Sequence, residues 1–325
     1  MPQRTAETNV QTTVSAIITT YNYGRFIGGA IDSVLHQTRP PDEVVIVDDG
    51  STDETAAIVA PYRSQGVRYI YQQNSGAGAA RNKGIQSTGG QLLAFLDADD
   101  RWMPNKLELQ LEHLRLHPTA GLITGSEWQV NLESKGAPQD EGPVLFRRRP
   151  VGAAQLYRRL LVENFVGNPS IVLVRRTRFE RAGLFDEGLR LGQDWDMWIR
   201  IAWTCRIGIV DAPLLYFNFH SGSLTAGQRE ARIASNREIR RRYIHQVRSP
   251  FARFQLLRAA TSMSHFYAAA SMSDDPSMRV STLRLAALAF LLDPTYETRL
   301  KAGLLFRAVV GRRAFQRVRD LLRRR

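Results

Sequence analysis

The chain has 325 residues, of which 43% are hydrophobic and 23% are charged. It is long enough for one large α/β domain with a helical appendage and too apolar to be disordered. Its single cysteine, Cys205, excludes an internal disulfide framework. Because we find neither a signal-peptide pattern nor an apolar stretch of about 20 residues, we expect a protein of the reducing cytoplasm without a transmembrane helix.

The net charge of +13 is unevenly distributed along the chain. Residues 229–325 carry 21 Arg and Lys against 7 Asp and Glu (+14), which leaves 23 against 24 (−1) for residues 1–228. The pattern predicts a neutral front part and a basic C-terminal region.

Strands and helices alternate in the first hundred residues. Residues 1–13 are polar and aperiodic, which predicts a disordered lead-in. Hydrophobic runs predict strands over 14–20, 43–47, 67–71 and 92–97, and the segments between them predict helices over about 26–37, 52–62 and 79–87. Such alternation is typical of right-handed βαβ units in a mainly parallel sheet.

The pattern is mixed between about residues 121 and 227. We expect strands over 122–125, 170–174, 206–210 and 214–219, and an amphipathic helix over 193–202. A polar loop is expected over 131–142, followed by a basic run at 147–149. Beyond residue 227 the chain predicts successive helices, broken at Pro250, Pro276 and Pro294.

Unusual polar residues follow the predicted strands, at the edge where ligands bind to parallel sheets. The strand over 92–97 delivers three carboxylates in four residues, from Asp97, Asp99 and Asp100. Carboxylates this close repel one another unless a hard cation such as Mg²⁺ or Mn²⁺ neutralises them, and such a cation usually also holds a phosphate. The alternative is a solvated acidic turn in which Asp100 caps the next helix.

Five segments in order carry a resemblance to a known family. They are residues 15–22 (SAIITTYN), 47–53 (VDDGSTD), 80–84 (ARNKG), 95–100 (FLDADD) and 193–198 (QDWDMW). Together they resemble family 2 glycosyltransferases over roughly residues 14–225. The resemblance implies a GT-A, Rossmann-like α/β fold, with a mainly parallel sheet flanked by helices and an all-helical C-terminal extension.

The same resemblance suggests a division of the chain. Residues 14–228 would form the catalytic domain, with a nucleotide-sugar-binding half over 14–120 and an acceptor-binding half over 121–228. Residues 229–325 would form the basic helical C-terminal region.

A donor site is expected at the ends of the first strands. An aromatic ring at Tyr21 and a carboxylate at Asp49 suit the flat face and the N–H edge of a nucleotide base, whereas Asp48 suits its own turn. Arg81 lies near ribose and phosphates in the look-alike family, or else forms a surface salt bridge to the Asp99 loop. The expected nucleotide-sugar-binding residues are Thr20, Tyr21, Asn22, Asp49, Arg81, Asp97, Ala98 and Asp99.

The resemblance also implies a divalent cation, Mn²⁺ or Mg²⁺. In the family Asp97 and Asp99 form a DxD motif whose cation bridges the diphosphate oxygens and stabilises the leaving group. His220 is a third candidate ligand, although a lone His at a strand end is often a surface residue.

The resemblance further implies a nucleotide-diphosphate sugar as donor and inversion at the anomeric carbon, and inversion requires one carboxylate that deprotonates the acceptor hydroxyl. Asp194 is the candidate base, and its alternative is a helix N-cap. The family usually has Glu-Asp at this point, whereas this chain has Gln193 before Asp194. Trp195 and Asn168 are the candidate acceptor-binding residues. Trp198, on the same helix, suits either a sugar-stacking face or core packing.

The resemblance and these features predict a metal-dependent inverting glycosyltransferase. It would move a sugar from a nucleotide-diphosphate donor to a glycan or lipid-linked acceptor, in surface polysaccharide or glycoconjugate synthesis. UDP is the commonest nucleotide in the family. The alternatives are a nucleotidyltransferase and a nucleic-acid-binding protein acting through its Arg-rich helices, although no nucleic-acid recognition pattern is present and no nucleic-acid partner is expected. The cationic amphipathic stretch at 300–313 predicts either peripheral contact with the anionic inner face of the cell membrane or an ordinary helical cap.

Overall fold

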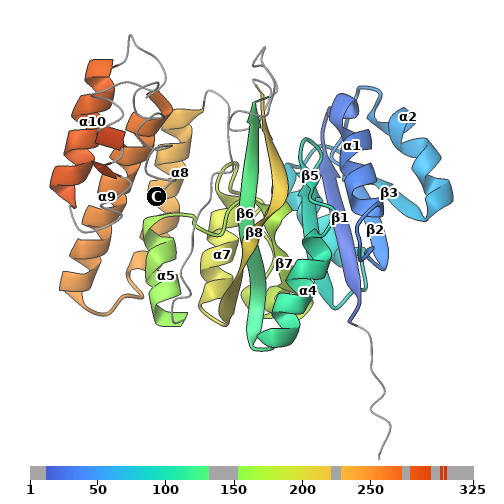
Figure 1. Ribbon diagram of the computed structural model, residues 1–325, viewed down its shortest axis with the longest axis horizontal. Helices are drawn as coiled ribbons and strands as arrows, with labels where there is room; N and C mark the ends of the chain where they lie inside the picture. Colours follow the sequence, from blue (N-terminus) through green and yellow to red (C-terminus); the bar gives the residue numbers. More distant parts are fainter. Residues whose placement is uncertain are drawn as a thin grey trace, which may run out of the picture. The chain divides into compact units, whose positions relative to one another are not determined.

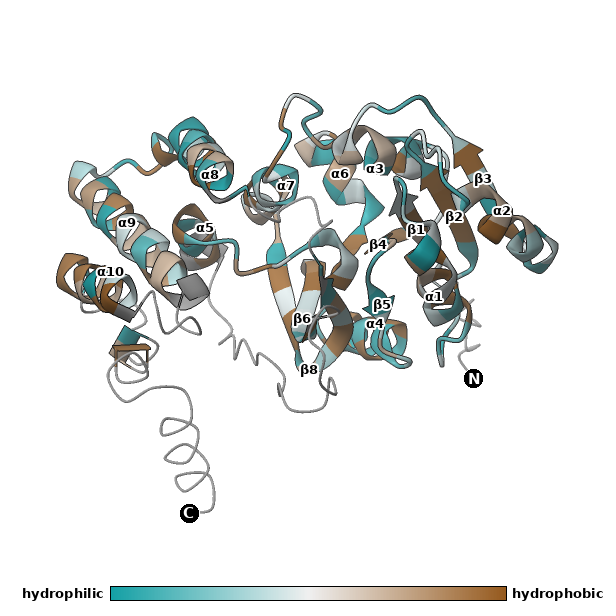
Figure 2. Ribbon diagram, turned by 90° about the horizontal axis from the view of Figure 1, so that it is seen from above, coloured by the Kyte–Doolittle hydropathy of each residue, from teal (hydrophilic) through white to brown (hydrophobic). Residues whose placement is uncertain are grey.

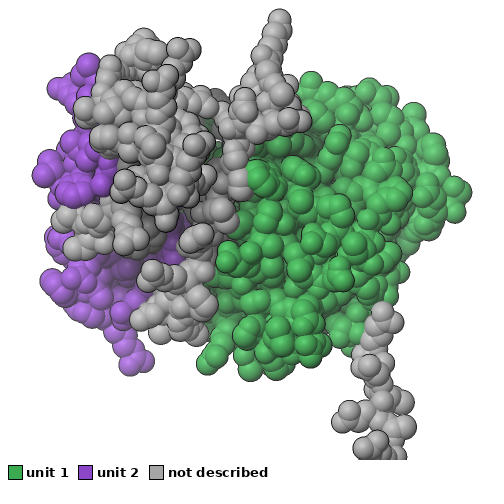
Figure 3. All heavy atoms as spheres, viewed as in Figure 1, with its two compact units in different colours: residues 1–157, 165–235 green, residues 158–164, 236–325 purple. Residues whose placement is uncertain are grey.

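The computed structural model describes residues 12–131, 153–220, 228–272, 279–293, 301–302 and 304–305. The predicted basic run at 147–149, most of the lead-in and nearly all of the polar loop lie outside these residues, as does most of the amphipathic stretch at 300–313. The chain forms two compact units, the first over residues 1–157 and 165–235 and the second over 158–164 and 236–325 (Figure 3). The functional domains assigned from the sequence stay a prediction.

The first unit alternates strands and helices in its N-terminal half (Figure 1). Its elements there are β1 (Val14–Thr20), α1 (Gly24–Leu35), β2 (Glu43–Asp48), α2 (Thr55–Val59), the 3-10 helix η1 (Ala60–Gln65), β3 (Val67–Tyr71), α3 (Ala77–Gln86), β4 (Leu92–Asp97), β5 (Arg101–Trp102) and α4 (Lys106–Leu116). Then follow β6 (Ala120–Asn131), α5 (Ala153–Val162), the 3-10 helix η2 (Pro169–Ile171), β7 (Leu173–Arg175), α6 (Arg176–Ala182), α7 (Gln193–Ala202) and β8 (Arg206–Phe219).

Eight strands within the described residues form one sheet, in the order β3-β2-β1-β4-β7-β6-β8-β5. The pairs among β3, β2, β1 and β4 are all parallel, as the sequence pattern predicts. Strand β7 is antiparallel to both of its neighbours, β4 and β6, and β5 is antiparallel to β8. The sheet is therefore mixed, and its parallel part aligns the carboxyl ends of β1, β2 and β4.

The sheet is covered by helices on both faces, which explains the unbroken apolar runs of its central strands. All seven residues of β1 are buried, and Figure 2 shows the strands of this region largely in the hydrophobic colour. Figures 1 and 2 place α3, α6 and α7 on one face and α1 and α4 on the other. Close packing leaves no space for a Cβ at Gly84 of α3, because that atom would lie 2.3 Å from Ile17.

Several elements differ from the sequence expectation. The strand expected over 170–174 is divided into η2 and β7, because Pro169 begins a 3-10 turn there. The two strands expected over 206–219 are one continuous β8, which accommodates Pro213 at an irregularity of its pairing with β6. Asp100 does not cap a helix, since α4 starts six residues later with Asn105 at its N-cap.

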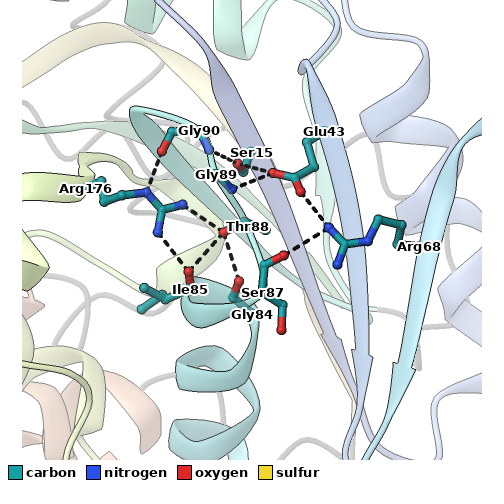
Figure 4. Close-up of polar contacts among 10 residues, drawn as sticks. All are labelled: Ser15, Glu43, Arg68, Gly84, Ile85, Ser87, Thr88, Gly89, Gly90 and Arg176. Carbon is teal, nitrogen blue, oxygen red and sulfur yellow. Dashed lines mark hydrogen bonds and ion pairs between the residues drawn. The ribbon is translucent and has the colours of Figure 1, made fainter.

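The amino end of β4 is held by a polar network far along the strand from the carboxylates (Figure 4). Arg176 donates to the carbonyls of Gly90 (2.7 Å) and Ile85 (2.8 Å) and to the hydroxyl of Thr88 (2.9 Å). Glu43 accepts hydrogen bonds from the hydroxyl of Ser15 (2.7 Å), from the backbone amide of Gly89 and from the guanidinium of Arg68. These contacts fix the turn from α3 into β4 and hence the register that delivers the acidic residues.

The second unit is helical. Helices α9 (Pro250–Met272) and α10 (Arg279–Leu292) pack together, and the hydroxyl of Ser262 donates to the carbonyl of Ala289 at 2.6 Å. The division between the units falls within α5 and within α8 (Arg229–Ile244). Throughout the described part of the chain, no helix has the length and apolarity needed to cross a membrane.

Candidate active site

The carboxyl ends of β1, β2 and β4 lie side by side. Thr19 pairs in register with Asp97 of β4, and Thr20 pairs with Asp48 of β2. The hydroxyl of Thr19 also donates to Oδ1 of Asp97 at 3.1 Å. The sequence-predicted residues that follow these strands are thus brought to one edge of the sheet.

Asp100 stabilises this edge of the sheet through hydrogen bonds within the protein and does not face a ligand. Its side chain is buried, and it accepts hydrogen bonds from the hydroxyl of Ser170 (2.6 Å), the amide of Asn218 (3.2 Å) and Nδ2 of Asn168 (3.4 Å). Ser170 in turn accepts the amide of Asp97 at 3.0 Å. Asp100 therefore ties η2 and the end of β8 to the acidic loop.

Asp99 faces His220. Nε2 of His220 lies 3.1 Å from Oδ2 of Asp99, and the His220 side chain is almost completely buried. The imidazole ring packs against Phe26 (4.9 Å between ring centroids) and against the edge of Tyr23 (5.6 Å). His220 is thus a buried part of the site and not a surface residue.

The acidic loop concentrates negative charge in a desolvated place. Burial raises the pKa of Asp99, and the neighbouring charge of Asp97 raises it further, against the opposing effect of His220. Burial and the charges of Asp99 and Asp97 likewise raise the pKa of Asp100 well above its usual range. A bound cation would relieve this repulsion.

Within the described residues there is no group of three or more His, Cys, Asp and Glu side chains arranged to hold a metal ion. Mg²⁺ in nucleotide sites, however, is held by one or two carboxylates together with substrate phosphates and water rather than by a protein cage. Neighbouring ligands of an octahedral ion at about 2.1 Å lie about 3 Å apart, which is close to the separation of the Asp99 and His220 atoms. Nδ1 of His220 is also buried, with no hydrogen-bond partner in the described part of the chain. Asp99 and His220 are therefore the side chains at this edge whose spacing would suit a cation.

Arg81 of α3 lies beside Asp97. Nη2 of Arg81 is 2.7 Å from Oδ1 of Asp97, and Nη1 donates to Oε1 of Gln193 at 3.3 Å. The ion pair to the acidic segment that was the alternative for Arg81 is therefore present, but it is buried and not at the surface, because the arginine is only 7% exposed. Its buried Nε has no hydrogen-bond partner among the residues that the structure describes.

Asp49 holds the loop that leads into α3. Its carboxylate accepts hydrogen bonds from Nε2 of Gln72 (2.7 Å) and from the amides of Ser75 (2.9 Å) and Gly76 (2.8 Å). These bonds occupy most of the acceptor sites of the carboxylate. Asp48 supports its own turn as expected, because it accepts the amide of Ser51 at 2.8 Å.

Thr20 ends β1, and Tyr21 and Asn22 form the turn that follows it. Tyr21 is 47% exposed, as a ring that stacks on a ligand must be. Asn22 has φ +55°, and its Oδ1 accepts the amide of Thr52 at 2.8 Å, so its side chain joins this turn to the one after β2. The hydroxyl of Thr20 is buried without a hydrogen-bond partner in the described residues.

Asp194 lies half-buried in the first turn of α7. The N-cap of this helix is Gly192, whose φ of +75° suits a glycine, so the alternative role of Asp194 as N-cap is wrong. Because Gln193 contacts Arg81, the start of α7 belongs to the same edge as the acidic loop.

One of the two predicted acceptor residues, Trp195, is placed differently from expectation. Trp195 is only 3% exposed, and a ring buried to this extent offers no open face for stacking a sugar. Trp198 is a core residue whose indole donates to the carbonyl of Gly167 at 2.9 Å. Asn168 contacts Asp100 and therefore lies beside the acidic loop.

The sequence missed Ser170, Asn218, Tyr23 and Phe26. Ser170 and Asn218 hold the acidic loop, and Tyr23 and Phe26 hold His220. Only the position of Ser170 at the start of a predicted strand gave any signal, since these contacts join residues as far apart in the sequence as Tyr23 and His220.

The chain matches the family described as “Glycosyl transferase family 2” over residues 15–181, about half of its length. The chain belongs to this family. The expectation of a glycosyltransferase is thereby confirmed at the level of the family, and the GT-A-like α/β fold is confirmed by the sheet and its neighbours.

Similar proteins include the putative teichuronic acid biosynthesis glycosyltransferase TuaG of Bacillus subtilis, 41% identical over 41% of this chain and 53% of the relative. The putative colanic acid biosynthesis glycosyl transferase WcaA of Escherichia coli is 30% identical over 58% of this chain and 65% of the relative. An uncharacterised glycosyltransferase of Nostoc is 38% identical over 39% of this chain and 42% of the relative. The matched part thus spans about half the length of these relatives.

Solved structures share the fold at low sequence identity. S. aureus TarS 1–349 in complex with UDP-GlcNAc has a TM-score of 0.63 and 20% identity, covering 94% of this chain and 88% of that one. The mannosyltransferase PcManGT of Pyrobaculum calidifontis, in complex with GDP-Man and Mn²⁺, has a TM-score of 0.57 and 20% identity, covering 91% of this chain and 86% of that one.

Proposed function

We propose that this chain transfers a sugar from a nucleotide-diphosphate donor to a hydroxyl of a glycan or lipid-linked acceptor, with inversion and with the help of Mn²⁺ or Mg²⁺. The observation that carries the proposal is the meeting of Asp97, Asp99, Arg81 and His220 at the carboxyl edge of the sheet. UDP is the proposed nucleotide and surface polysaccharide the proposed product class, by analogy with the ligand of TarS and the names of TuaG and WcaA.

Donor binding is assigned to the turns after β1, β2 and β4. Exposed Tyr21 offers a ring to the base, and Asp49 shapes the glycine-containing loop that approaches the diphosphate. Arg81 supplies a buried positive charge next to the acidic loop. A divalent ion held by Asp99, with Asp97 and His220 beside it, would supply Lewis-acid stabilisation of the departing diphosphate.

The acceptor side is assigned to the start of α7. A carboxylate at Asp194 takes the proton of the attacking hydroxyl while the bond to the anomeric carbon forms on the face opposite the diphosphate. No protonated side chain is required on the donor side, because Arg81, together with a cation held by Asp99, would stabilise the leaving charge. Asn168, which contacts Asp100, is placed to shape the pocket between the two substrates.

The experiment is a thermal-shift screen of UDP-, GDP- and dTDP-sugars with and without Mn²⁺, followed by a transfer assay on the donor that binds. We expect one nucleotide class to raise the melting temperature only with the metal present, and the product to have the inverted anomeric configuration by NMR. A chain that binds no nucleotide sugar under any condition, or that gives a retained product, contradicts the proposal.

We further propose that the second unit contacts an anionic membrane, which would bring the enzyme to a lipid-linked acceptor. Residues 236–325 carry 19 Arg and Lys against 6 Asp and Glu, a net +13 that equals the charge of the whole chain. At the start of α9, Phe251, Phe254 and Leu257 are 69%, 61% and 46% exposed. Exposed Arg237, Arg241 and Arg248 precede them in the chain, and basic residues next to aromatic ones favour a bilayer interface.

The test is co-sedimentation of the whole chain with vesicles of phosphatidylglycerol and phosphatidylcholine, against phosphatidylcholine alone. Binding is expected only to the anionic vesicles, and we expect the Phe251→Ser/Phe254→Ser variant to lose most of it. Leu116→Ser is the control, because Leu116 is 58% exposed on the first unit. If the chain binds no vesicles but binds duplex DNA in a salt-dependent way, the nucleic-acid alternative is favoured instead.

A further inference from the structure

Gln193 occupies the position where the family usually has Glu. Both the oxygen and the nitrogen of its side-chain amide form hydrogen bonds. Oε1 accepts a hydrogen bond from Nη1 of Arg81 at 3.3 Å, and Nε2 donates to the carbonyl of Leu189 at 2.5 Å. The side chain is buried. A glutamate of the same shape could accept a hydrogen bond from Arg81. Its other carboxylate oxygen would, however, face the carbonyl oxygen of Leu189, and two acceptors cannot form a hydrogen bond with each other.

Gln193 reaches Arg81 because α3 and the segment before α7 are fastened together. The side chain of Asn82 pairs with the backbone of Phe185, accepting its amide at 2.8 Å and donating to its carbonyl at 2.9 Å. A Cβ on Gly78 would lie 3.3 Å from Cδ of Gln193, so the two residues are in contact. The position of Gln193 next to the guanidinium is therefore determined by the fold.

The charge balance around Arg81 depends on this amide being neutral. Among the residues that the structure describes, Arg81 has one carboxylate partner, Asp97, and its Nη1 is held by the uncharged Gln193. The ring of Phe185 lies 5.8 Å from the guanidinium carbon and offers no formal charge. A second carboxylate at position 193 would share Arg81 with Asp97 and weaken its attraction for a phosphate.

We propose that Gln193 is a positioning residue for the donor diphosphate: it orients the Arg81 guanidinium without neutralising it. The proposal rests on the proposed function, since it takes the ligand of Arg81 to be the donor's diphosphate. It assigns to Gln193 an effect on donor affinity and not on proton transfer by Asp194, although the two residues are adjacent in sequence.

The test is the donor dissociation constant and the kcat and KM of Gln193→Glu, measured on the whole chain with Mn²⁺ and the donor identified in the screen. We expect donor affinity to fall about tenfold, KM for the donor to rise in parallel, and kcat to change by less than about threefold. Gln86→Glu is the matched control, because Gln86 is an exposed residue of the same helix α3 as Arg81, and its donor affinity should equal that of the wild type.

A double-mutant cycle separates this role from a merely structural one. In an Arg81→Met background, Gln193→Glu should change donor affinity by less than about twofold. Equal donor affinity of Gln193→Glu and the wild type, or an undiminished effect in the Arg81→Met background, overturns the proposal. If the wild type binds a donor normally while Gln193→Glu has no effect, the proposed function survives; if the wild type binds no nucleotide sugar, both fail.

Discussion

The hydroxyl of Ser170 donates to the carboxylate of Asp100 at 2.6 Å and accepts the backbone amide of Asp97 at 3.0 Å. One fully buried side chain thus fixes two residues of the acidic loop. The metal and diphosphate site proposed for this chain therefore depends on a residue 70 positions away in the sequence.

Replacing Ser170 by Ala should reduce both stability and donor binding. The change leaves the buried amide of Asp97 and an oxygen of Asp100 without this partner, at a cost of about 1–3 kcal/mol in the free energy of unfolding. Urea denaturation measures the effect, with Ser264→Ala of α9 as control, since the hydroxyl of Ser264 donates to the carbonyl of Ala260 in its own helix. A Ser170→Ala protein as stable as the control would show that Asp100 is held without the hydroxyl.

Arg176 offers a test at the opposite end of β4 (Figure 4). Arg176→Met loses three hydrogen bonds to the turn between α3 and β4 and should lower the free energy of unfolding by about 2 kcal/mol. Because this turn is remote from the carboxylates along the strand, we expect the folded variant to bind donor with wild-type affinity. Arg181→Met, an exposed position on the same helix α6, should alter neither quantity. Loss of donor affinity in a folded Arg176→Met protein would contradict this separation.

Lys106 gives the chain a stability that depends on pH. It is fully buried, its Nζ lies 2.8 Å from Oε1 of Gln110 and 4.3 Å from the ring centre of Trp102, and burial holds its pKa well below the usual value. Between that lowered pKa and the ordinary value of 10.5, the unfolded chain binds a proton that the folded one does not. The free energy of unfolding should therefore rise with pH through this window, by up to about 1.4 kcal/mol per pH unit.

The measurement is the difference in unfolding free energy between the wild type and Lys106→Met from about pH 7 to about pH 10, where the methionine variant lacks the titrating group. The difference should move in favour of the wild type as the pH rises. A difference that stays flat, or that moves the other way, would show that Lys106 keeps its proton in the folded state at an ordinary pKa.

The sequence predicted well which residues gather at this edge of the sheet, because their positions follow from the ends of parallel strands. Asp97, Asp99 and Arg81 come together because parallel strands align their carboxyl ends, a rule that needs only the order of elements. The burial of Trp195 was not predictable in the same way. Both tryptophans of α7 fall at positions compatible with a core face or an open one, and only the packed fold decides between them.

The contacts that hold the loops could not be predicted from the sequence either. The residues around Asp100 in the sequence predict a helix cap, but its partners Ser170 and Asn218 lie 70 and 118 residues away. Gln193 reads as a missing charge, whereas the fold shows both ends of its amide in use. Local patterns carry no information about such distant partners.

The most direct test of the central claim is a comparison of Asp99→Ala and Asp194→Ala, in which donor affinity with Mn²⁺ and the rate of sugar transfer are measured on the same preparations. We expect Asp99→Ala to lose metal-dependent donor binding by at least about tenfold. Asp194→Ala should bind donor within about threefold of the wild type and transfer at least about 100-fold more slowly. Transfer at the wild-type rate by Asp194→Ala, or unchanged metal-dependent binding by Asp99→Ala, would contradict the account.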